Sequence, residues 1–234
     1  MISIIIPVFN QADKIVKTFK SILNQTYRDF EVVVVNDGSK DDVEKVAESF
    51  SQNFNQADIS FKFFNQENKG APAARNRGWR EAKGEYLFFS DADAILNPDL
   101  LKKLLDALMN NPGASFAYPS FYWGKKLFKG REFDAEKLKQ TPYIHTMALI
   151  RKSDFPATGW DESIKKFQDW DLWLTMSGLG HKGIFVDQIL FKIIPGGIIS
   201  SWVPSFAYKY LPWLPQVKKY NTALKVIKEK HKLP

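Results

Sequence analysis

The first half of the chain alternates short apolar runs with segments whose apolar residues recur at helical spacing. Residues 2–8 and 31–36 are rich in Ile and Val and lack polar alternation, which is typical of strands buried on both faces. Between these runs, one face of a predicted helix carries Ile15, Phe19, Ile22 and Leu23. The same alternation predicts strands over 59–64 and 85–90, helices over 41–50 and 71–82, and a leucine-rich helix that opens at 97–99. This rhythm predicts βαβ units around a mostly parallel sheet, an α/β fold.

After residue 113 the pattern loosens. Strands are predicted over residues 115–121 and 144–151, with irregular polar segments between them. We interpret this region as the second half of the same α/β domain, because 234 residues with 44% hydrophobic content suffice for one sizeable core.

The composition excludes several kinds of site. The chain has no cysteine, so disulfides, thiolate metal sites and cysteine nucleophiles are excluded. Its three histidines, His145, His181 and His231, lack the spacing of a metal site, and we interpret His181 as a turn residue. The apolar start is too short for a signal peptide, and prolines, lysine and glycines interrupt the apolar stretch 193–217. We therefore expect no signal peptide, no transmembrane helix and a cytoplasmic location.

The positive charge gathers at the C-terminal end. Residues 188–234 contain eight lysines and one glutamate, so this segment alone carries the net charge of +7 found for the whole chain. Aromatic residues are interleaved with the lysines, at Trp202, Phe206, Tyr208, Tyr210 and Trp213. This mixture favours peripheral contact with an anionic membrane surface. The alternative is a tail whose aromatics pack on the domain and whose lysines from 218 to 232 form a solvated helix face. No nucleic acid is expected as a partner, because the first half has no basic stripe and no nucleic-acid motif is present.

Four polar loops follow predicted strands, where open α/β sheets bind ligands. In the last of them, Asp91 and Asp93 present two carboxylates on one side of a short turn, which suits Mg²⁺ or Mn²⁺ with diphosphate oxygens completing the shell. The others are residues 7–10, 36–39 and 68–76. In the loop 36–39, Asp37 could accept a hydrogen bond from a base N–H, and the alternative is a plain Asp-Gly turn with Ser39 capping the next helix. In the loop 68–76, Arg75 could pair with a phosphate, and the alternative is a surface salt bridge.

Taken in order, these segments resemble the family 2 glycosyltransferases with a GT-A fold. The matching stretches are Ile-Ile-Ile-Pro-Val-Phe-Asn at 4–10, Val-Asn-Asp-Gly-Ser at 35–39, Asn-Lys-Gly at 68–70 with Arg-Asn at 75–76, and Asp-Ala-Asp at 91–93. Downstream, Gly-Trp-Asp-Glu at 159–162 and Gln-Asp-Trp-Asp-Leu-Trp at 168–173 resemble the segments of that family beside the acceptor and around the catalytic carboxylate. The resemblance covers roughly residues 1–190. It implies a GT-A domain over 1–193, with a nucleotide-sugar half (1–113) and an acceptor-facing half (114–193), followed by a basic aromatic extension (194–234).

The resemblance also implies a function. Members of the family are inverting enzymes that move a sugar from a nucleotide-diphosphate sugar to an acceptor hydroxyl, with a metal at the Asp-x-Asp motif. We expect a UDP-sugar donor, Mn²⁺ or Mg²⁺, and a glycan or lipid-linked acceptor in polysaccharide, glycolipid or glycoprotein glycan synthesis. A catalytically inactive nucleotide-sugar-binding module is the alternative.

Site residues follow from the resemblance position by position. The nucleobase would be held by Pro7, Phe9 and Asp37, and Arg75 would lie near the base or its diphosphate. Asp91 would contact the ribose or the metal's water shell, Asp93 would ligate the metal, and Asp169 would be the general base. Acceptor contacts would fall on Trp160, Asp161, Glu162 and Gln168.

Two positions depart from the family pattern. Gln168 stands where the family often has Glu, which would alter contacts to the acceptor. Where the family often places Arg or His against the diphosphate, this chain offers only Lys192.

Overall fold

A computed structural model describes residues 1–196 and 213–233 of the chain. One nine-stranded mixed sheet runs through the described residues in the order β3-β2-β1-β4-β8-β6-β9-β5, with β7 paired to β6. The first four strands along the chain are parallel to one another, and a helix connects each strand to the next. In chain order these elements are β1 (Ile2–Val8), α1 (Ala12–Leu23), β2 (Phe30–Asn36), α2 (Val43–Gln56), β3 (Phe61–Asn65), α3 (Ala71–Glu81) and β4 (Tyr86–Phe89). The alternating pattern of the first half thus predicted these elements correctly.

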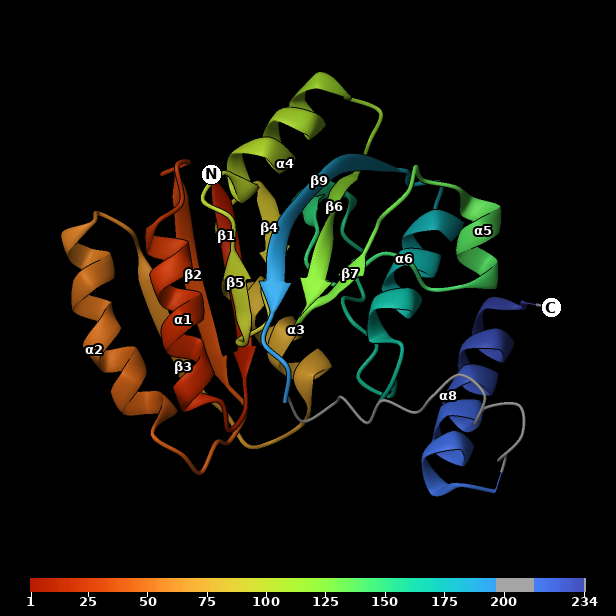
Figure 1. The fold of residues 1–234 in the computed structure, drawn as a ribbon, viewed down its shortest axis with the longest axis horizontal. Helices are drawn as coiled ribbons and strands as arrows, with labels where there is room; N and C mark the ends of the chain where they lie inside the picture. The colour runs from red at the N-terminus through yellow and green to blue at the C-terminus, as the bar shows by residue number, and fades with distance from the viewer. Residues whose placement is uncertain (197–212, 234) are drawn as a thin grey trace.

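The rest of the chain, from residue 94 onward, extends the same sheet with antiparallel and parallel strands. Its elements are β5 (Ala94–Leu96), α4 (Leu100–Asn110), β6 (Phe116–Trp123), β7 (Lys126–Phe128), α5 (Ala135–Gln140), β8 (Leu149–Arg151), a short 3₁₀ turn (Lys152–Asp154), α6 (Gln168–Gly178), β9 (Gly183–Ile193) and α8 (Pro215–His231). Figure 1 shows α1 and α2 beside the β1–β3 edge, with α5, α6 and α8 grouped at the other side of the molecule. This arrangement is the α/β architecture with helices flanking a mostly parallel sheet that the sequence predicts.

The strand expected over residues 144–151 is shorter than predicted and covers only Leu149–Arg151. Polar groups of the preceding residues bond elsewhere: the carbonyl of Ile144 accepts from Trp173 Nε1, and Tyr143 exchanges hydrogen bonds with the backbone of Asp134. A carbonyl and a hydroxyl engaged in this way tie the segment to α6 and to the start of α5 instead of to a neighbouring strand. The long strand β9, which the sequence pattern did not predict, lies on the other side of β6 and pairs with β6 and β5.

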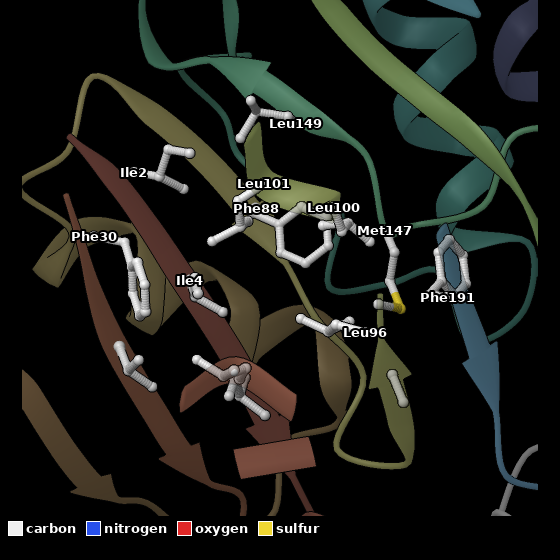
Figure 2. Packing of buried hydrophobic residues seen from close by; sticks show 14 of the residues in the cluster. Ile2, Ile4, Phe30, Phe88, Leu96, Leu100, Leu101, Met147, Leu149 and Phe191 are labelled. Atoms are coloured by element: carbon white, nitrogen blue, oxygen red, sulfur yellow. The ribbon is translucent and has the colours of Figure 1, made fainter. Parts of the chain in front are cut away.

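The core lies on both faces of the sheet. Ile2, Ile4 and Ile6 of β1 belong to one buried cluster, whereas Ile5 belongs to the other. Because successive side chains of a strand point to opposite faces, an all-apolar strand needs a cover on each side. Figure 2 shows the first cluster, in which side chains from β1, β2 and β4 meet Leu100 and Leu101 of α4, Met147, Leu149 of β8 and Phe191 of β9.

The C-terminal helix α8 packs on this domain. Its Val217 and Ile227 are fully buried, and Ile227 belongs to the second core cluster. Trp213, just before the helix, is 62% exposed, while Trp202, Phe206, Tyr208 and Tyr210 lie outside the described residues. Lys230 is ion-paired with two aspartates, so the alternative in which every lysine from 218 to 232 faces solvent is wrong for this residue. No helix in the described part of the chain is long and apolar enough to cross a bilayer.

Helix α3 lies very close to β1 because residue 78 is a glycine. A Cβ atom at Gly78 would meet Ile5 Cγ2 at 2.4 Å, well inside contact distance. This close approach fixes the height of α3 over the sheet, and α3 carries Arg75 one turn earlier.

We predict that Gly78→Ala lowers the free energy of unfolding by about 1–3 kcal/mol, because the added methyl group overpacks the interface between α3 and β1. Gly178→Ala is the matched control, since a Cβ at Gly178 would meet nothing within 4 Å. Urea unfolding followed by circular dichroism measures both. Equal stability of the two variants would contradict the tight packing.

Candidate functional site

The four predicted loops meet at one cavity of about 500 Å³ at the carboxyl ends of the parallel strands. The cavity wall includes these side chains from the first half of the chain: Pro7, Phe9, Gln11, Asp37, Arg75, Asp91 and Asp93. From the second half it includes His145, Lys165, Lys166, Phe167, Gln168 and Asp169. Residues far apart in the sequence thus face a single space that can hold a ligand of nucleotide size.

Asp37 borders this cavity, and three hydrogen bonds hold its carboxylate. Its Oδ1 accepts hydrogen bonds from Gln66 Nε2 at 2.8 Å and from the backbone N–H of Lys69 at 2.9 Å, and its Oδ2 accepts from the N–H of Gly70 at 2.8 Å. A carboxylate offers about four acceptor positions, so these three bonds leave capacity for one donor from a ligand.

Ser39 does not cap the following helix, so the alternative for this loop is wrong on this point. Helix α2 begins only at Val43, and Ser39 Oγ instead accepts a hydrogen bond from the backbone N–H of Asn10 at 2.9 Å. In the other direction, Asn10 Oδ1 accepts from the N–H of Lys40 at 2.8 Å. The two loops after β1 and β2 are therefore tied to each other rather than to α2.

Arg75 is a buried cation, not the surface ion pair that was the alternative from the sequence. The residue is 5% exposed, and its guanidinium lies over the ring of Trp160 at 4.7 Å. It donates to Gln168 Oε1 at 2.8 Å and pairs with Asp91 Oδ1 at 3.5 Å, while its Nε has no partner among the described residues. Burial lowers the pKa of Arg75, and the neighbouring Asp91 and Asp169 oppose that effect. The guanidinium remains charged and faces the cavity with one neutral amide and one long ion pair, a setting that favours an anionic ligand.

Asp91 and Asp93 are neighbouring carboxylates, and the surroundings of Asp93 disfavour its charge. Asp93 is 8% exposed and accepts one side-chain hydrogen bond, from Gln11 Nε2 at 3.2 Å. Burial and the neighbouring charge of Asp91 raise the pKa of Asp93 to about 6. A divalent cation between these oxygens and a ligand would relieve both effects.

The donor set fits Mg²⁺ or Mn²⁺ bound together with a diphosphate. No cluster of three or more His, Cys, Asp or Glu side chains that could hold a metal occurs in residues 1–196 and 213–233. Magnesium is commonly held by one or two carboxylates with substrate phosphates and water as the remaining ligands. Asp91 and Asp93 would supply that protein share.

His145 borders the cavity, although it is not among the site residues that the sequence predicts. Its Nε2 lies 3.7 Å from Asp91 Oδ2, its Nδ1 accepts from the N–H of Met147 at 3.2 Å, and its ring packs beside Phe121 and Phe191. Spacing along the sequence could not reveal this contact. It arises because β8, which follows His145, pairs antiparallel with β4, which precedes Asp91.

Asp169 lies in the first turn of α6 and faces the same cavity. Its Oδ1 accepts from the N–H of Trp170 at 2.9 Å. Burial raises the pKa of Asp169 despite the opposing influence of His145 and Arg75. A desolvated carboxylate with a raised pKa is a better proton acceptor than an exposed one, which suits a general base.

The four residues predicted for the acceptor do not lie together. Gln168 faces the cavity described above, whereas Trp160, Asp161 and Glu162 border a second cavity of about 520 Å³. The Trp160 ring is 3% exposed and packs edge-on against Phe89. It therefore offers no open face on which a sugar could stack. Acceptor roles for the other three stay predictions.

Asn76 holds the segment that carries Trp160. Its side-chain amide accepts from the N–H of Trp160 and donates to the carbonyl of the same residue, both at 2.8 Å, and it also donates to Glu162 Oε1. Gly159 permits this contact, because its φ is +69° and a Cβ there would meet Asn76 Oδ1 at 2.4 Å. The Arg-Asn pair at 75–76 thus works in two directions, with Arg75 toward the first cavity and Asn76 toward the second.

Two remaining candidates lie away from the first cavity. Lys192 is an exposed residue of β9 and does not border it. His181 lies in the turn before β9, as predicted, where its Nδ1 is 3.0 Å from Ser115 Oγ.

Comparison with known proteins gives the family. The family model described as Glycosyl transferase family 2 matches residues 3–158. The chain belongs to this family. It is 29% identical over 236 residues to an uncharacterized glycosyltransferase of Rickettsia conorii, a match that covers 94% of this chain and 36% of that protein. It is also 29% identical over 188 residues to the chondroitin synthase of Escherichia coli, covering 77% of this chain and 27% of that protein. The chain thus spans about a third or less of the length of these two family members.

Solved structures show that this family 2 chain has the GT-A fold. S. aureus TarS in complex with UDP-GlcNAc matches with a TM-score of 0.71 at 19% identity, covering 92% of this chain and 66% of that chain. The mannosyltransferase PcManGT of Pyrobaculum calidifontis, in complex with GDP-Man and Mn²⁺, matches with a TM-score of 0.67 at 19% identity, covering 86% and 58%.

We predict that Asp93→Asn stabilises the metal-free protein by about 1–3 kcal/mol near pH 7.5, because the amide removes a desolvated charge beside Asp91. The pKa of Asp93 in the folded protein is about 6, above the ordinary value of about 3.9, so the stability of the wild-type protein falls as pH rises from about 4 to about 6. The gain of the variant should disappear below about pH 3, where Asp93 is protonated in both the folded and the unfolded state. Calorimetric melting in EDTA across this pH range measures it. A variant that is less stable at neutral pH, or equally favoured at every pH, would contradict the raised pKa.

Proposed function

We propose that the first cavity binds a nucleotide-diphosphate sugar and that the protein transfers the sugar, with inversion, to an acceptor hydroxyl. The observation that carries this proposal is the convergence of Asp37, Arg75, Asp91, Asp93 and Asp169 on one cavity of about 500 Å³. This reaction needs a hydrogen-bond acceptor for the nucleobase, a buried cation, a pair of carboxylates and a separate desolvated carboxylate.

The donor that fits best is a UDP-sugar. Asp37 has capacity for one further hydrogen bond, which suits the ring N–H of a pyrimidine, and Pro7 and Phe9 border the same cavity. TarS, a structural neighbour, was solved with UDP-GlcNAc, which supports this choice. PcManGT, solved with GDP-Man, makes a purine donor the main competitor.

Arg75 and the aspartate pair would stabilise the leaving group. Breaking the bond from the anomeric carbon to the diphosphate builds negative charge on the diphosphate oxygens. A bound Mn²⁺ or Mg²⁺ held by Asp93 and Asp91 would neutralise part of this charge as a Lewis acid. Arg75 is a fixed cation on the same side, and its burial strengthens its effect on a nearby charge.

Asp169 would accept the proton of the attacking hydroxyl. The acceptor oxygen forms its bond to the anomeric carbon as the bond to the diphosphate breaks, and attack opposite the leaving group inverts the configuration. An acceptor hydroxyl is a weak acid, so a carboxylate with a raised pKa beside it is required at neutral pH. Gln168 keeps the neighbouring position neutral and bonds Arg75 without cancelling its charge.

The acceptor that we propose is a glycan or a lipid-linked saccharide. Lys165 and Lys166 border the cavity close to Asp169, so the acceptor side is basic. Contact of the C-terminal segment with an anionic membrane stays a prediction, because four of the five aromatic residues on which it rests lie outside the described residues.

A donor-binding panel tests the proposed function. Isothermal calorimetry with UDP-, GDP- and dTDP-sugars, with and without Mn²⁺, should show binding of UDP-sugars that Mn²⁺ strengthens by at least about tenfold. Asp93→Ala should lose the Mn²⁺ effect because the direct ligand is gone. Absence of binding for every nucleotide class would favour a different ligand, and preserved Mn²⁺ dependence in the variant would remove Asp93 from the metal site.

We predict that Asp169→Asn lowers turnover by roughly 10²–10⁴-fold while donor affinity stays unchanged, because the amide cannot accept the proton. Release of nucleoside diphosphate from the donor measures turnover, and calorimetry measures affinity. If the folded variant turned over as fast as the wild-type protein, Asp169 would be excluded as the base. If the wild-type protein itself bound the donor without turnover, the alternative of an inactive nucleotide-sugar-binding module would be supported.

A further inference from the structure

The described C-terminal residues meet the catalytic segment at a buried carboxylate. Asp171 lies in the first turn of α6, two residues after Asp169, and is 3% exposed. Lys230 Nζ of α8 lies 2.8 Å from Asp171 Oδ1, and His231 Nε2 lies 2.7 Å from the same oxygen. A buried carboxylate requires such compensation, since desolvation strongly disfavours an unpaired charge.

Lys230 also reaches a second segment. Its Nζ lies 2.7 Å from Asp161 Oδ2, while Asp161 Oδ1 accepts from the N–H and the hydroxyl of Ser163. One ammonium group thus joins α6 to the 159–162 segment. The residue before Asp161 is Trp160, whose ring carries the Arg75 guanidinium, and Arg75 in turn donates to Gln168 beside Asp169.

A third contact involves Phe167, the residue directly before α6. The ring of Tyr220, in α8, meets the ring of Phe167 edge-on with centroids 5.0 Å apart. Phe167 adopts φ +61°, a conformation that non-glycine residues rarely adopt, directly before Gln168 and Asp169. A residue in that region needs support from its surroundings, which Tyr220 and Trp170 provide.

From these contacts we propose that Lys230 is a positioning residue for the transfer reaction. It holds Asp171 and Asp161 and thereby fixes the first turn of α6, so that Asp169 points into the donor cavity. Helix α8 is then a working part of the transferase domain and not an appendage to it, although it lies outside the residues 3–158 that match the family. The catalytic consequence rests on the proposed function, whereas the mechanical consequence, a rigid first turn of α6, does not.

Lys230→Met tests both consequences, with Lys225→Met as the matched control. Lys225 lies on the same helix and pairs only across the surface, with Glu229 at 3.6 Å, among the contacts described. Hydrogen exchange followed by mass spectrometry reports the rigidity of residues 168–171. Exchange there should accelerate at least about tenfold in Lys230→Met and remain unchanged in Lys225→Met. Equal protection in the two variants would overturn the proposal, whatever the activity of the protein.

The catalytic arm uses hydrolysis of UDP-GlcNAc in the presence of Mn²⁺, with water as acceptor, so that acceptor binding has no influence. For Lys230→Met the kcat should fall at least about tenfold while KM stays within about twofold, and Lys230→Arg should recover most of the loss. If Lys230→Met does not fold, Asp161→Asn replaces it, because the Asp161 side chain is 33% exposed and Asp171 keeps its contacts with Lys230 and His231. An unchanged kcat in the folded variant would overturn the catalytic role. A wild-type protein that neither binds nor hydrolyses the donor would instead contradict the proposed function, and the exchange experiment would still decide the mechanical claim.

Discussion

The buried guanidinium of Arg75 is the interaction on which the candidate site depends. It comes from a helix of the first half and touches three segments of the chain: the turn after β4 through Asp91, the ring of Trp160, and the start of α6 through Gln168. A buried cation can be stable only if its surroundings supply negative or polar groups. Asp91 and Gln168, which compensate Arg75, also border the first cavity, so the fold and the site are specified together.

This arrangement disfavours the charged form of two of the carboxylates that border the cavity. Burial raises the pKa of both Asp93 and Asp169, so each is held in a setting that opposes its charge. Such settings are common where groups must bind a cation or accept a proton, and they reduce the stability of the unliganded protein. Asp171 is buried as well, but the ammonium group of Lys230 and the imidazole of His231, both in α8, contact its carboxylate. The surroundings of Asp171 therefore stabilise its charge, whereas burial opposes the charge of Asp93 and Asp169.

The sequence was most informative where local pattern and motif agreed. The apolar run at 2–8 and the helical spacing from Ile15 to Leu23 correspond to β1 and α1, and the polar loops that follow the strands do converge. Parallel strands bring their carboxyl ends to one edge, so order along the chain was enough to predict that convergence. The sequence could not predict pairings that depend on the second half. The contact of His145 with Asp91 follows from the antiparallel pairing of β8 with β4, and that of Lys230 with Asp171 from the return of α8 to α6. The sequence also could not show that Trp160 is buried beneath Arg75, because an aromatic residue in a polar segment fits a packing role and a binding role equally well.

The most direct test of this account is a crystal structure of the protein grown with UDP and Mn²⁺, with anomalous diffraction recorded to locate the manganese. We expect one anomalous peak at about 2–2.5 Å from a carboxylate oxygen of Asp93, with the diphosphate between that peak and Arg75 and the uracil at Asp37. A nucleotide bound elsewhere, or manganese at a site without Asp91 or Asp93, would contradict the central claim that these residues form one donor site.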